Sequence, residues 1–201
     1  MKKILLFVFG FVLTAGTALA AEDTEPDRYY IPPPQFNAAI EVMDLGFANV
    51  FGLFRNATGS FEFEPATKTV DNLKLAIDLS SLIASNPGNE RDLMVMLGAL
   101  QYPEIVFTTK DSVSFAEGKA DIKGTLTVHG ASKPFVLEAT LNQIGKSPAG
   151  GGMWESQGKA IGISMRGTFK RADFGMADDP MAKARFGDSI TLLLEAQAIR
   201  Q

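Results

Sequence analysis

The only histidine of the chain, His129, lies in the stretch GTLTVHGASKPF, three residues before Ser132. A Ser–His pair could begin a nucleophilic site, but such a site also needs an orienting carboxylate and an oxyanion hole. The segment Gly162-Ile163-Ser164-Met165-Arg166-Gly167 does not match G-x-S-x-G, which places a serine on a sharp strand-to-helix turn. We therefore predict no catalytic residue, and His129 fits better as part of a turn.

Metal and nucleotide sites have equally little support. Transition-metal sites usually combine several His, Cys or carboxylate ligands at defined spacing, and the chain has one His and no Cys. The nearest cluster, Asp178-Asp179-Pro180-Met181, is expected to form a solvated loop. Neither G-x-x-x-x-G-K-[ST] nor G-x-G-x-x-G occurs. The sequence predicts no metal and no cofactor.

Arg171 and Asp173 are the other charged residues that attract attention, because they precede Phe174 at an expected strand end. The structural interpretation is that they pair with each other or with loop carbonyls. The alternative is a polar role at the mouth of a cavity. Both interpretations remain open at the level of the sequence.

The first twenty residues have the pattern of a secretory signal peptide. Lys2 and Lys3 precede an apolar run, and Ala18-Leu19-Ala20 is a small-x-small cleavage site. A membrane anchor is the less favoured alternative, because the run is short and ends in small residues. We expect a signal peptide over 1–20 and a single domain over 21–201, without stable membrane insertion. A bacterial periplasm fits best.

Composition narrows the function further. Loss of the leader's two lysines changes the formal net charge of −4 for the whole chain to −6. Such a chain has no electrostatic reason to bind nucleic acid or anionic membranes. Without cysteines the fold must hold without disulfides, and fifteen Phe residues suit a large apolar core or a cavity lining.

The dominant hydrophobic period is two, which indicates strands with one apolar face. Leu73, Leu75, Ile77 and Leu79, for example, alternate with more polar residues. The segment 21–27 is acidic and is expected to be a loose N-terminus. So many short strands predict an all-β sandwich or a closed barrel, which can be filled or hold a small ligand. The expected strands span 36–43, 48–55, 60–64, 73–79, 104–109, 112–116, 126–128, 135–141, 160–170 and 190–196.

One segment, 89–100, has helical spacing instead. Leu93, Met96, Leu97 and Leu100 recur at i, i+3, i+4 and i+7, and Asn89 is the expected N-cap. The short helix is interpreted either as a plug that closes one end of the core or as a lid over a lipid pocket.

Short motifs along most of the chain resemble the YceI-like family, exported bacterial proteins with an extended lipocalin-like barrel that binds polyisoprenoid lipids. The family's hairpin G-x-L-T-x-H-G-x-x-K resembles the segment around His129, with Gly130–Pro134 as the expected turn. The other matches, in order, are Gly52-Leu53-Phe54, Gly59–Pro65, Ile77–Leu82, Arg91-Asp92-Leu93, Tyr102–Phe107, Arg171–Met176 and Gly187-Asp188.

Two departures from the family pattern stand out. Members usually open with Y-x-I-D-P-x-H-S, whereas this chain has Tyr29-Tyr30-Ile31-Pro32-Pro33-Pro34-Gln35-Phe36 and lacks the Asp and His. A second family histidine falls near Asp44. The resemblance therefore does not extend to a role that needs these histidines.

The resemblance implies an all-β, antiparallel barrel of about eight strands with a short helix near one mouth. It also implies a non-catalytic carrier for an isoprenoid lipid or an isoprenoid quinone, and a homodimer. The alternatives are a filled barrel with an interaction or stress-protection role, and a lipid- or quinone-modifying enzyme. The expected lining comprises Phe54, Phe61, Leu75, Ile77, Phe107, Leu126, Val128 and Phe169, with Leu93, Met96 and Leu97 closing the mouth.

Overall fold

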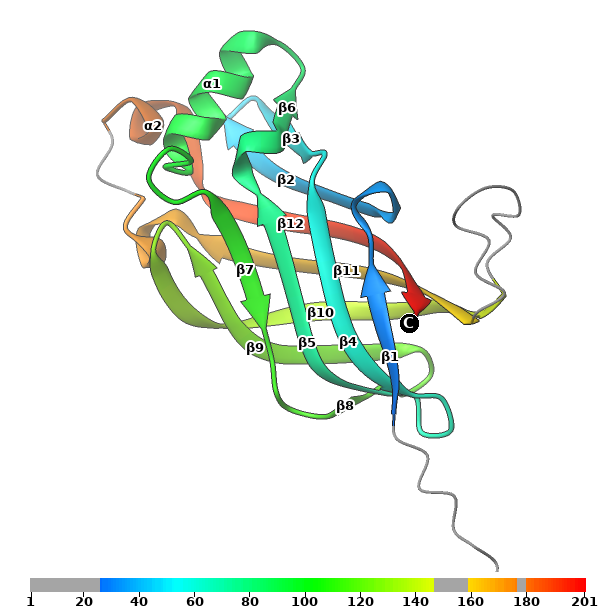
Figure 1. Ribbon diagram of the computed structural model, residues 1–201. Coiled ribbons are helices and arrows are strands. Elements are labelled where there is room, and N and C mark those ends of the chain that lie inside the picture. The colour runs from blue at the N-terminus through cyan, green and yellow to red at the C-terminus, as the bar shows by residue number, and fades with distance from the viewer. Residues whose placement is uncertain (1–25, 147–158, 177–179) are drawn as a thin grey trace, which may run out of the picture.

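A computed structural model describes residues 26–146, 159–176 and 180–201, in which antiparallel β-strands dominate (Figure 1). All the expected strands are present, with ends shifted by up to seven residues. The signal-peptide segment and the glycine run at 150–152 lie outside the described residues. The strands are β1 (Asp27–Ile31), β2 (Phe36–Asp44), β3 (Ala48–Phe54), β4 (Ala57–Glu64), β5 (Thr69–Asp78), β6 (Leu82–Ala84), β7 (Glu104–Thr108), β8 (Val113–Ser114), β9 (Lys119–Val128), β10 (Ala131–Lys146), β11 (Lys159–Lys170) and β12 (Phe186–Arg200).

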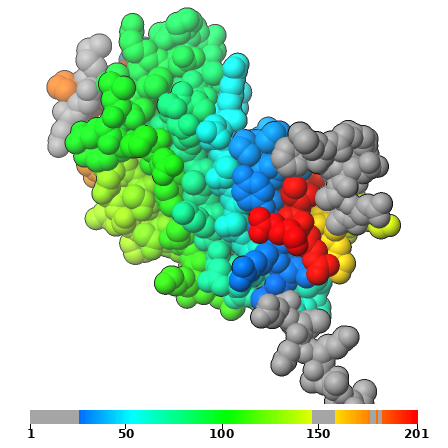
Figure 2. All heavy atoms as spheres, in the orientation of Figure 1, coloured from blue at the N-terminus to red at the C-terminus, as the bar shows by residue number. Residues whose placement is uncertain are grey.

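Eight strands close into a barrel, which confirms the predicted fold class. The ring runs β1-β4-β5-β7-β9-β10-β11-β12, and a second pairing of β12 with β1 closes it. In the space-filling view the blue atoms of β1 accordingly lie against the red atoms of β12 (Figure 2). Closure removes the exposed sheet edges that an open sheet would leave in the ring.

The expectation of a loose N-terminus over 21–27 was wrong at its last residue, because Asp27 begins β1. β1 has only five residues and stops before three consecutive prolines, so it carries a weak periodic signal. Its pairing partners are residues of β4 and the C-terminal end of β12. The strand that closes the barrel is therefore stabilised by pairing with distant strands, and its own hydrophobic periodicity does not predict it.

Two short 3-10 helices interrupt the run of strands. The short 3-10 helix η1 (Pro33–Gln35) separates β1 from β2, and both of these strands pair with β12. The 3-10 helix η2 (Leu79–Ser81) likewise separates β5 from β6, which pairs with β3. The hairpin β2–β3 and β6 thereby extend the sheet below the helix, as Figure 1 shows.

Helix α1 (Pro87–Met96) begins earlier than predicted. Its N-cap is Asn86, not Asn89, because the Asn86 side chain accepts from the Asn89 N–H and Pro87 occupies the first turn. Gly98 in the left-handed region then ends the helix, with the Ala99 N–H donating to the Met94 carbonyl. This stop turns Leu100 outward to 101% exposure, so its predicted place on the inner face was wrong.

A second helix, α2 (Pro180–Arg185), lies beside α1 at the same end of the barrel (Figure 1). The predicted loop over 178–181 is therefore wrong for Pro180 and Met181, which open α2, whereas Asp178 and Asp179 lie outside the described residues. Pro180 suits the first turn of a helix, because its missing N–H would have no partner there. The end of α2 leads directly into β12.

A further short 3-10 segment, η3 (Arg171–Phe174), follows β11. The core lies inside the ring and under α1, and its members alternate along each strand as the period of two requires. Buried residues of β5, for example, are Val70, Leu73, Leu75 and Ile77. Burial of one face of every strand is what stabilises this disulfide-free fold.

Candidate functional site

The apolar interior of the barrel is the candidate site, and all eleven residues expected to line it are buried. Eight come from the strands and three from α1 and its end, so the ring and the helix together place them around one core. Their role in binding remains a prediction. The residues are Phe54, Phe61, Leu75, Ile77, Phe107, Leu126, Val128, Phe169, Leu93, Met96 and Leu97.

Aromatic rings form a continuous path through part of this interior. Phe107 meets Phe135 edge-on at a centroid distance of 6.3 Å, and Phe135 meets Phe169 at 6.2 Å. Phe169 then contacts Phe174 at 5.1 Å. Phe135 and Phe174 were missing from the expected lining, although Phe135 shares the inward parity of Leu137 on β10. Parity alone could have identified Phe135.

Glycines on inward-facing positions show how tightly the interior is packed. A Cβ added at Gly59 would lie 2.6 Å from Ile31 Cδ1 and 2.8 Å from Leu75 Cδ2. At Gly124 it would lie 2.5 Å from both Phe107 Cζ and the Thr108 carbonyl oxygen. These positions bring side chains of neighbouring strands close to the sheet itself, so a ligand must displace or reorient such side chains.

Tyr29 places a polar group on the inner face of β1. Its side chain is 1% exposed, stacks on Phe61 at 5.5 Å and meets Phe63 edge-on at 6.0 Å. Burial raises the pKa of the Tyr29 hydroxyl, with a further increase from the negative charge of Asp27 that Arg200 partly offsets. The hydroxyl is buried without a hydrogen-bond partner among residues 26–146, 159–176 and 180–201.

Asp27 and Arg200 form an ion pair near Tyr29, at the end of the barrel away from α1. Arg200 Nη2 lies 2.5 Å from Asp27 Oδ1. Arg200 is also the strand partner of Tyr29 across the β1–β12 closure. This corner therefore combines a charged pair with a neutral hydroxyl donor beside an otherwise apolar core.

The opposite end is held by Arg185, the last residue of α2. Its guanidinium donates in a fork to Asp44, with Nε–Oδ1 and Nη2–Oδ2 distances of 2.8 and 3.0 Å. It also donates to Asp92 and Asn89 of α1. The hydrogen bond from Arg185 lowers the pKa of the Asp44 carboxyl. One cation thus joins the β2–β3 hairpin, α1 and the start of β12.

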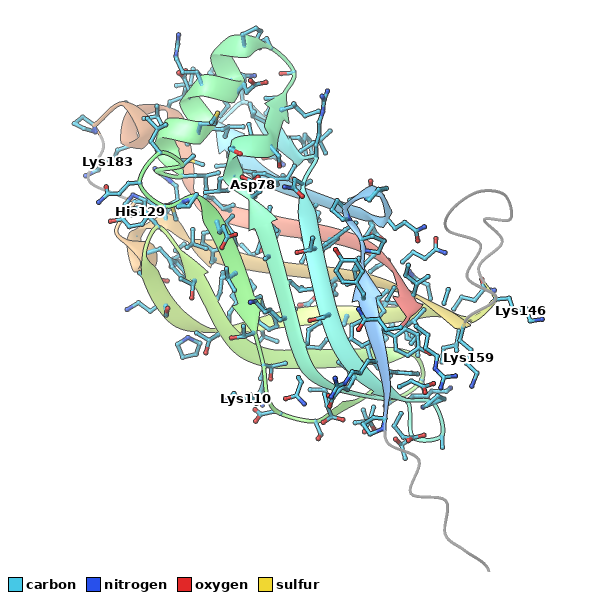
Figure 3. The ribbon with its side chains drawn as sticks, viewed as in Figure 1. Asp78, Lys110, His129, Lys146, Lys159 and Lys183 are labelled. Carbon is cyan, nitrogen blue, oxygen red and sulfur yellow. The ribbon has the colours of Figure 1, made fainter. Side chains whose placement is uncertain are left out.

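His129 occupies a turn, but not the turn that was predicted. The turn consists of His129 and Gly130, both at positive φ, and β10 starts at Ala131, so the expected turn over 130–134 was wrong. Two residues with φ above zero match the right-handed twist of a hairpin. The imidazole packs on the Tyr102 ring at 4.6 Å, near the α1 end (Figure 3). This contact gives His129 a packing role.

The hydrogen bonds of Arg171 favour the structural interpretation of this residue over a polar role at the mouth of a cavity. Arg171 is 3% exposed, and it donates to the carbonyl oxygens of Gly187, Phe186 and Met176 at 2.9, 2.8 and 3.3 Å. Arg171 thus binds backbone carbonyls, as predicted, but two of the three belong to the first residues of β12 rather than to a loop, and Asp173 is exposed. Arg171 holds the segment after β11 against the start of β12.

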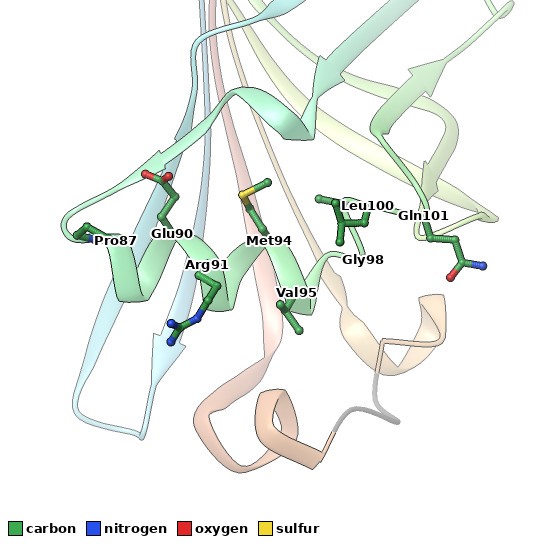
Figure 4. A pocket seen from close by; sticks show the side chains of 9 residues that line it. Pro87, Glu90, Arg91, Met94, Val95, Gly98, Leu100 and Gln101 are labelled. Atoms are coloured by element: carbon green, nitrogen blue, oxygen red, sulfur yellow. The ribbon is translucent and has the colours of Figure 1, made fainter.

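A surface hollow of about 480 Å³ lies on the outer side of α1 (Figure 4). Its walls include Met94, Val95 and Leu100, whereas Leu93 and Met96 are buried in the core. Ala99 lines the hollow and also belongs to the core, so the hollow adjoins the core at the end of α1. Within the described ranges there is no cluster of three or more potential metal ligands, and none of the described helices is long and apolar enough to cross a membrane.

Comparison with known proteins identifies the family of this chain. Residues 29–198 match the family described as the YceI-like domain. The chain belongs to the YceI-like family. Protein YceI of Salmonella agona is 28% identical over 208 residues, with both chains covered completely. A UPF0312 protein of Pseudomonas savastanoi is 29% identical over 170 residues, which cover 82% of this chain and 81% of the relative.

Solved structures agree with the YceI-like barrel. A Campylobacter jejuni YceI protein has a TM-score of 0.62 at 27% identity, over 75% of this chain and 84% of that one. Burkholderia cenocepacia BcnA gives 0.68 at 14% identity, over 83% and 98%. A polyisoprenoid binding domain from Saccharophagus degradans gives 0.60 at 11% identity, over 88% and 100%. The last two show the fold alone.

The two departures from the YceI-like pattern have different structural consequences. Asp44, near the second family histidine, is bound by Arg185 and belongs to the closure of the α1 end. Gln35, at the position of the first family histidine, has a buried side-chain oxygen without a partner among the described residues. Asp44 is therefore part of a hydrogen-bond network, whereas the Gln35 side-chain oxygen is not part of one among the described residues.

Proposed function

We propose that this YceI-like protein is a non-catalytic, periplasmic carrier for an isoprenoid lipid, held by its prenyl or quinone tail inside the barrel. The observation that carries the proposal is a closed eight-stranded ring in which every strand buries apolar side chains on its inner face. The family membership and the polyisoprenoid binding domain with the same fold add support.

The hydrophobic free energy of burying a prenyl tail is large enough for micromolar binding. Each carbon unit of a prenyl tail that leaves water contributes roughly 0.8 kcal/mol before ordering costs. About 8 kcal/mol corresponds to a micromolar dissociation constant. Enclosure of around a dozen units would reach this value, so an apolar interior can hold a tail without charged contacts.

The test is to purify the protein from its own host, extract it with organic solvent and identify the extract by mass spectrometry. A stoichiometric prenyl lipid is expected. Leu126→Trp, which fills the interior, should lower the lipid content, whereas Thr125→Trp on the outer face of the same strand should not. Leu75→Phe provides a milder interior change if Leu126→Trp does not fold. A clean extract and no uptake of added prenyl lipid would contradict the proposal.

A filled barrel with an interaction or stress-protection role is the second candidate. The observation that favours it is the close approach of Ile31 and Leu75 to Gly59, and of Phe107 to Gly124. It predicts no extracted lipid and no effect of Leu126→Trp beyond a change in stability. The same extraction therefore separates the two candidates.

A further inference from the structure

A buried tyrosine hydroxyl without a partner is unusual and calls for a physical reason. Removal of a hydroxyl from water without a compensating hydrogen bond destabilises a fold by about 1–3 kcal/mol. Phenylalanine would keep the stacking on Phe61 and the edge contact with Phe63 at this position. The hydroxyl of Tyr29 therefore contributes nothing to these ring contacts and is a donor that the described fold does not use.

The direction of the hydroxyl is set by β1. Tyr29 shares the inward parity of Ile31, whose side chain packs against Gly59 and Leu75 in the core. The hydroxyl lies close enough to Asp27 and Arg200 to feel both charges. It is therefore placed where the apolar interior meets the Asp27–Arg200 pair, on β1, a strand that lies away from α1 in Figure 1.

The chemistry of this corner selects one kind of ligand atom. A protonated phenol donates one hydrogen bond, and its raised pKa keeps Tyr29 protonated at neutral pH. Asp27 is already paired with Arg200, so the free donor suits a neutral oxygen acceptor such as a hydroxyl or a quinone carbonyl. A pure hydrocarbon has no atom that could accept this bond.

We propose that Tyr29 is the polar anchor of the lipid site: its hydroxyl donates to an oxygen at one end of the bound prenyl compound. This inference rests on the proposed function and deepens it, because it names oxygen-bearing prenyl compounds as the ligand class. The tail then extends from the β1 end towards the residues buried beneath α1. Tyr29 determines which end of the lipid enters the charged corner.

Matched probes test the anchor directly. Delipidated wild-type protein, Tyr29→Phe and Tyr30→Phe are titrated with geranylgeraniol and with the hydrocarbon analogue that lacks its hydroxyl, by isothermal titration calorimetry. Tyr29→Phe should weaken binding of the alcohol roughly three- to tenfold, the value of one hydrogen bond, and leave hydrocarbon affinity unchanged. Tyr30, less buried and on the other face of β1, supplies the control for loss of a hydroxyl and should change neither affinity.

Each other outcome has a distinct meaning. Equal effects of Tyr29→Phe on both probes, or no effect on either, would overturn the anchor while leaving the carrier function intact. Binding of neither probe to the wild-type protein would reject the carrier function and the anchor with it. A lower melting temperature for Tyr29→Phe would also overturn the inference, because it would show that the hydroxyl has a structural partner.

Discussion

The two ends of the barrel differ in how one buried or half-buried polar side chain at each end is partnered. At the α1 end, Arg185 has acceptors on the β2–β3 hairpin and on α1. At the β1 end, the Tyr29 hydroxyl is buried without a partner among the described residues. The hydrogen bonds of Arg185 therefore stabilise the packing of α1 on the β2–β3 hairpin. The unpartnered Tyr29 hydroxyl at the β1 end, in contrast, lowers the stability of the fold.

The largest effect should come from the packing that closes the α1 end. Leu93→Ala removes a fully buried side chain beneath the helix and should lower the free energy of unfolding by about 2–5 kcal/mol. Val95→Ala on the same helix, where the side chain is 56% exposed, should change it by less than about 0.5 kcal/mol. Urea denaturation measures both. Equal values would mean that α1 does not close the core.

Loss of the cation should have the next largest effect. Arg185→Met keeps an unbranched apolar stem but leaves Asp44 and Asp92 without this donor, and should cost about 1.5–3 kcal/mol in urea denaturation. Hydrogen exchange at the amides of α1 should increase as well. Lys183→Met, at an exposed position on α2, is the control and should have little effect. Unchanged exchange in α1 would show that Arg185 does not hold the helix.

Acid should destabilise the α1 end less than the loss of Arg185 does. The folded-state pKa of Asp44 lies below its ordinary value of 3.8, so its contribution is complete above that value and is lost as the pH falls through the folded pKa. Wild-type stability should therefore decrease below about pH 4, and Asp44→Asn should flatten this part of the profile. Thermal melts across this pH range provide the measurement. An identical slope in Asp44→Asn would exclude the pair as its source.

The smallest effect should have the opposite sign. Tyr29→Phe removes the unpartnered hydroxyl and should raise the free energy of unfolding of the lipid-free protein by up to about 1 kcal/mol. A gain at Tyr29 beside a loss at Arg185 would establish the contrast between the two ends. Destabilisation by Tyr29→Phe would remove that contrast, and thermal melts of delipidated protein distinguish the outcomes.

Much of the fold could be predicted from local pattern, because a strand with one buried face repeats its apolar residues every second position. β5 and β12 were recognisable in this way. β1 was not, because five residues before a proline run carry too little periodicity. The inward positions at Phe61, Leu75 and Leu126 were also predictable, since parity assigns them to a buried face, although it does not assign them a ligand.

For α1, local sequence rules predicted that a helix forms but not the residues at which it begins and ends. Asn86 and Asn89 are both good N-cap residues, and only the hydrogen bond from the Asn89 N–H to Asn86 decides between them. The outward turn of Leu100 follows from the left-handed Gly98, which ends the periodic pattern three residues after Val95. Helical spacing alone could not reveal that stop.

By itself, the sequence determined the class of the fold, the alternation of its strands and the absence of a recognisable catalytic motif, because these depend on residue types and short spacings. Only the tertiary structure decided that β1 closes the ring with β12 and that Arg185 joins Asp44 to α1. It also decided that the Tyr29 hydroxyl is buried without a partner among the described residues. The physical reason is that closure and hydrogen-bond partnership depend on residues far apart in the chain. Their meeting is set by the register of the whole barrel rather than by any local pattern.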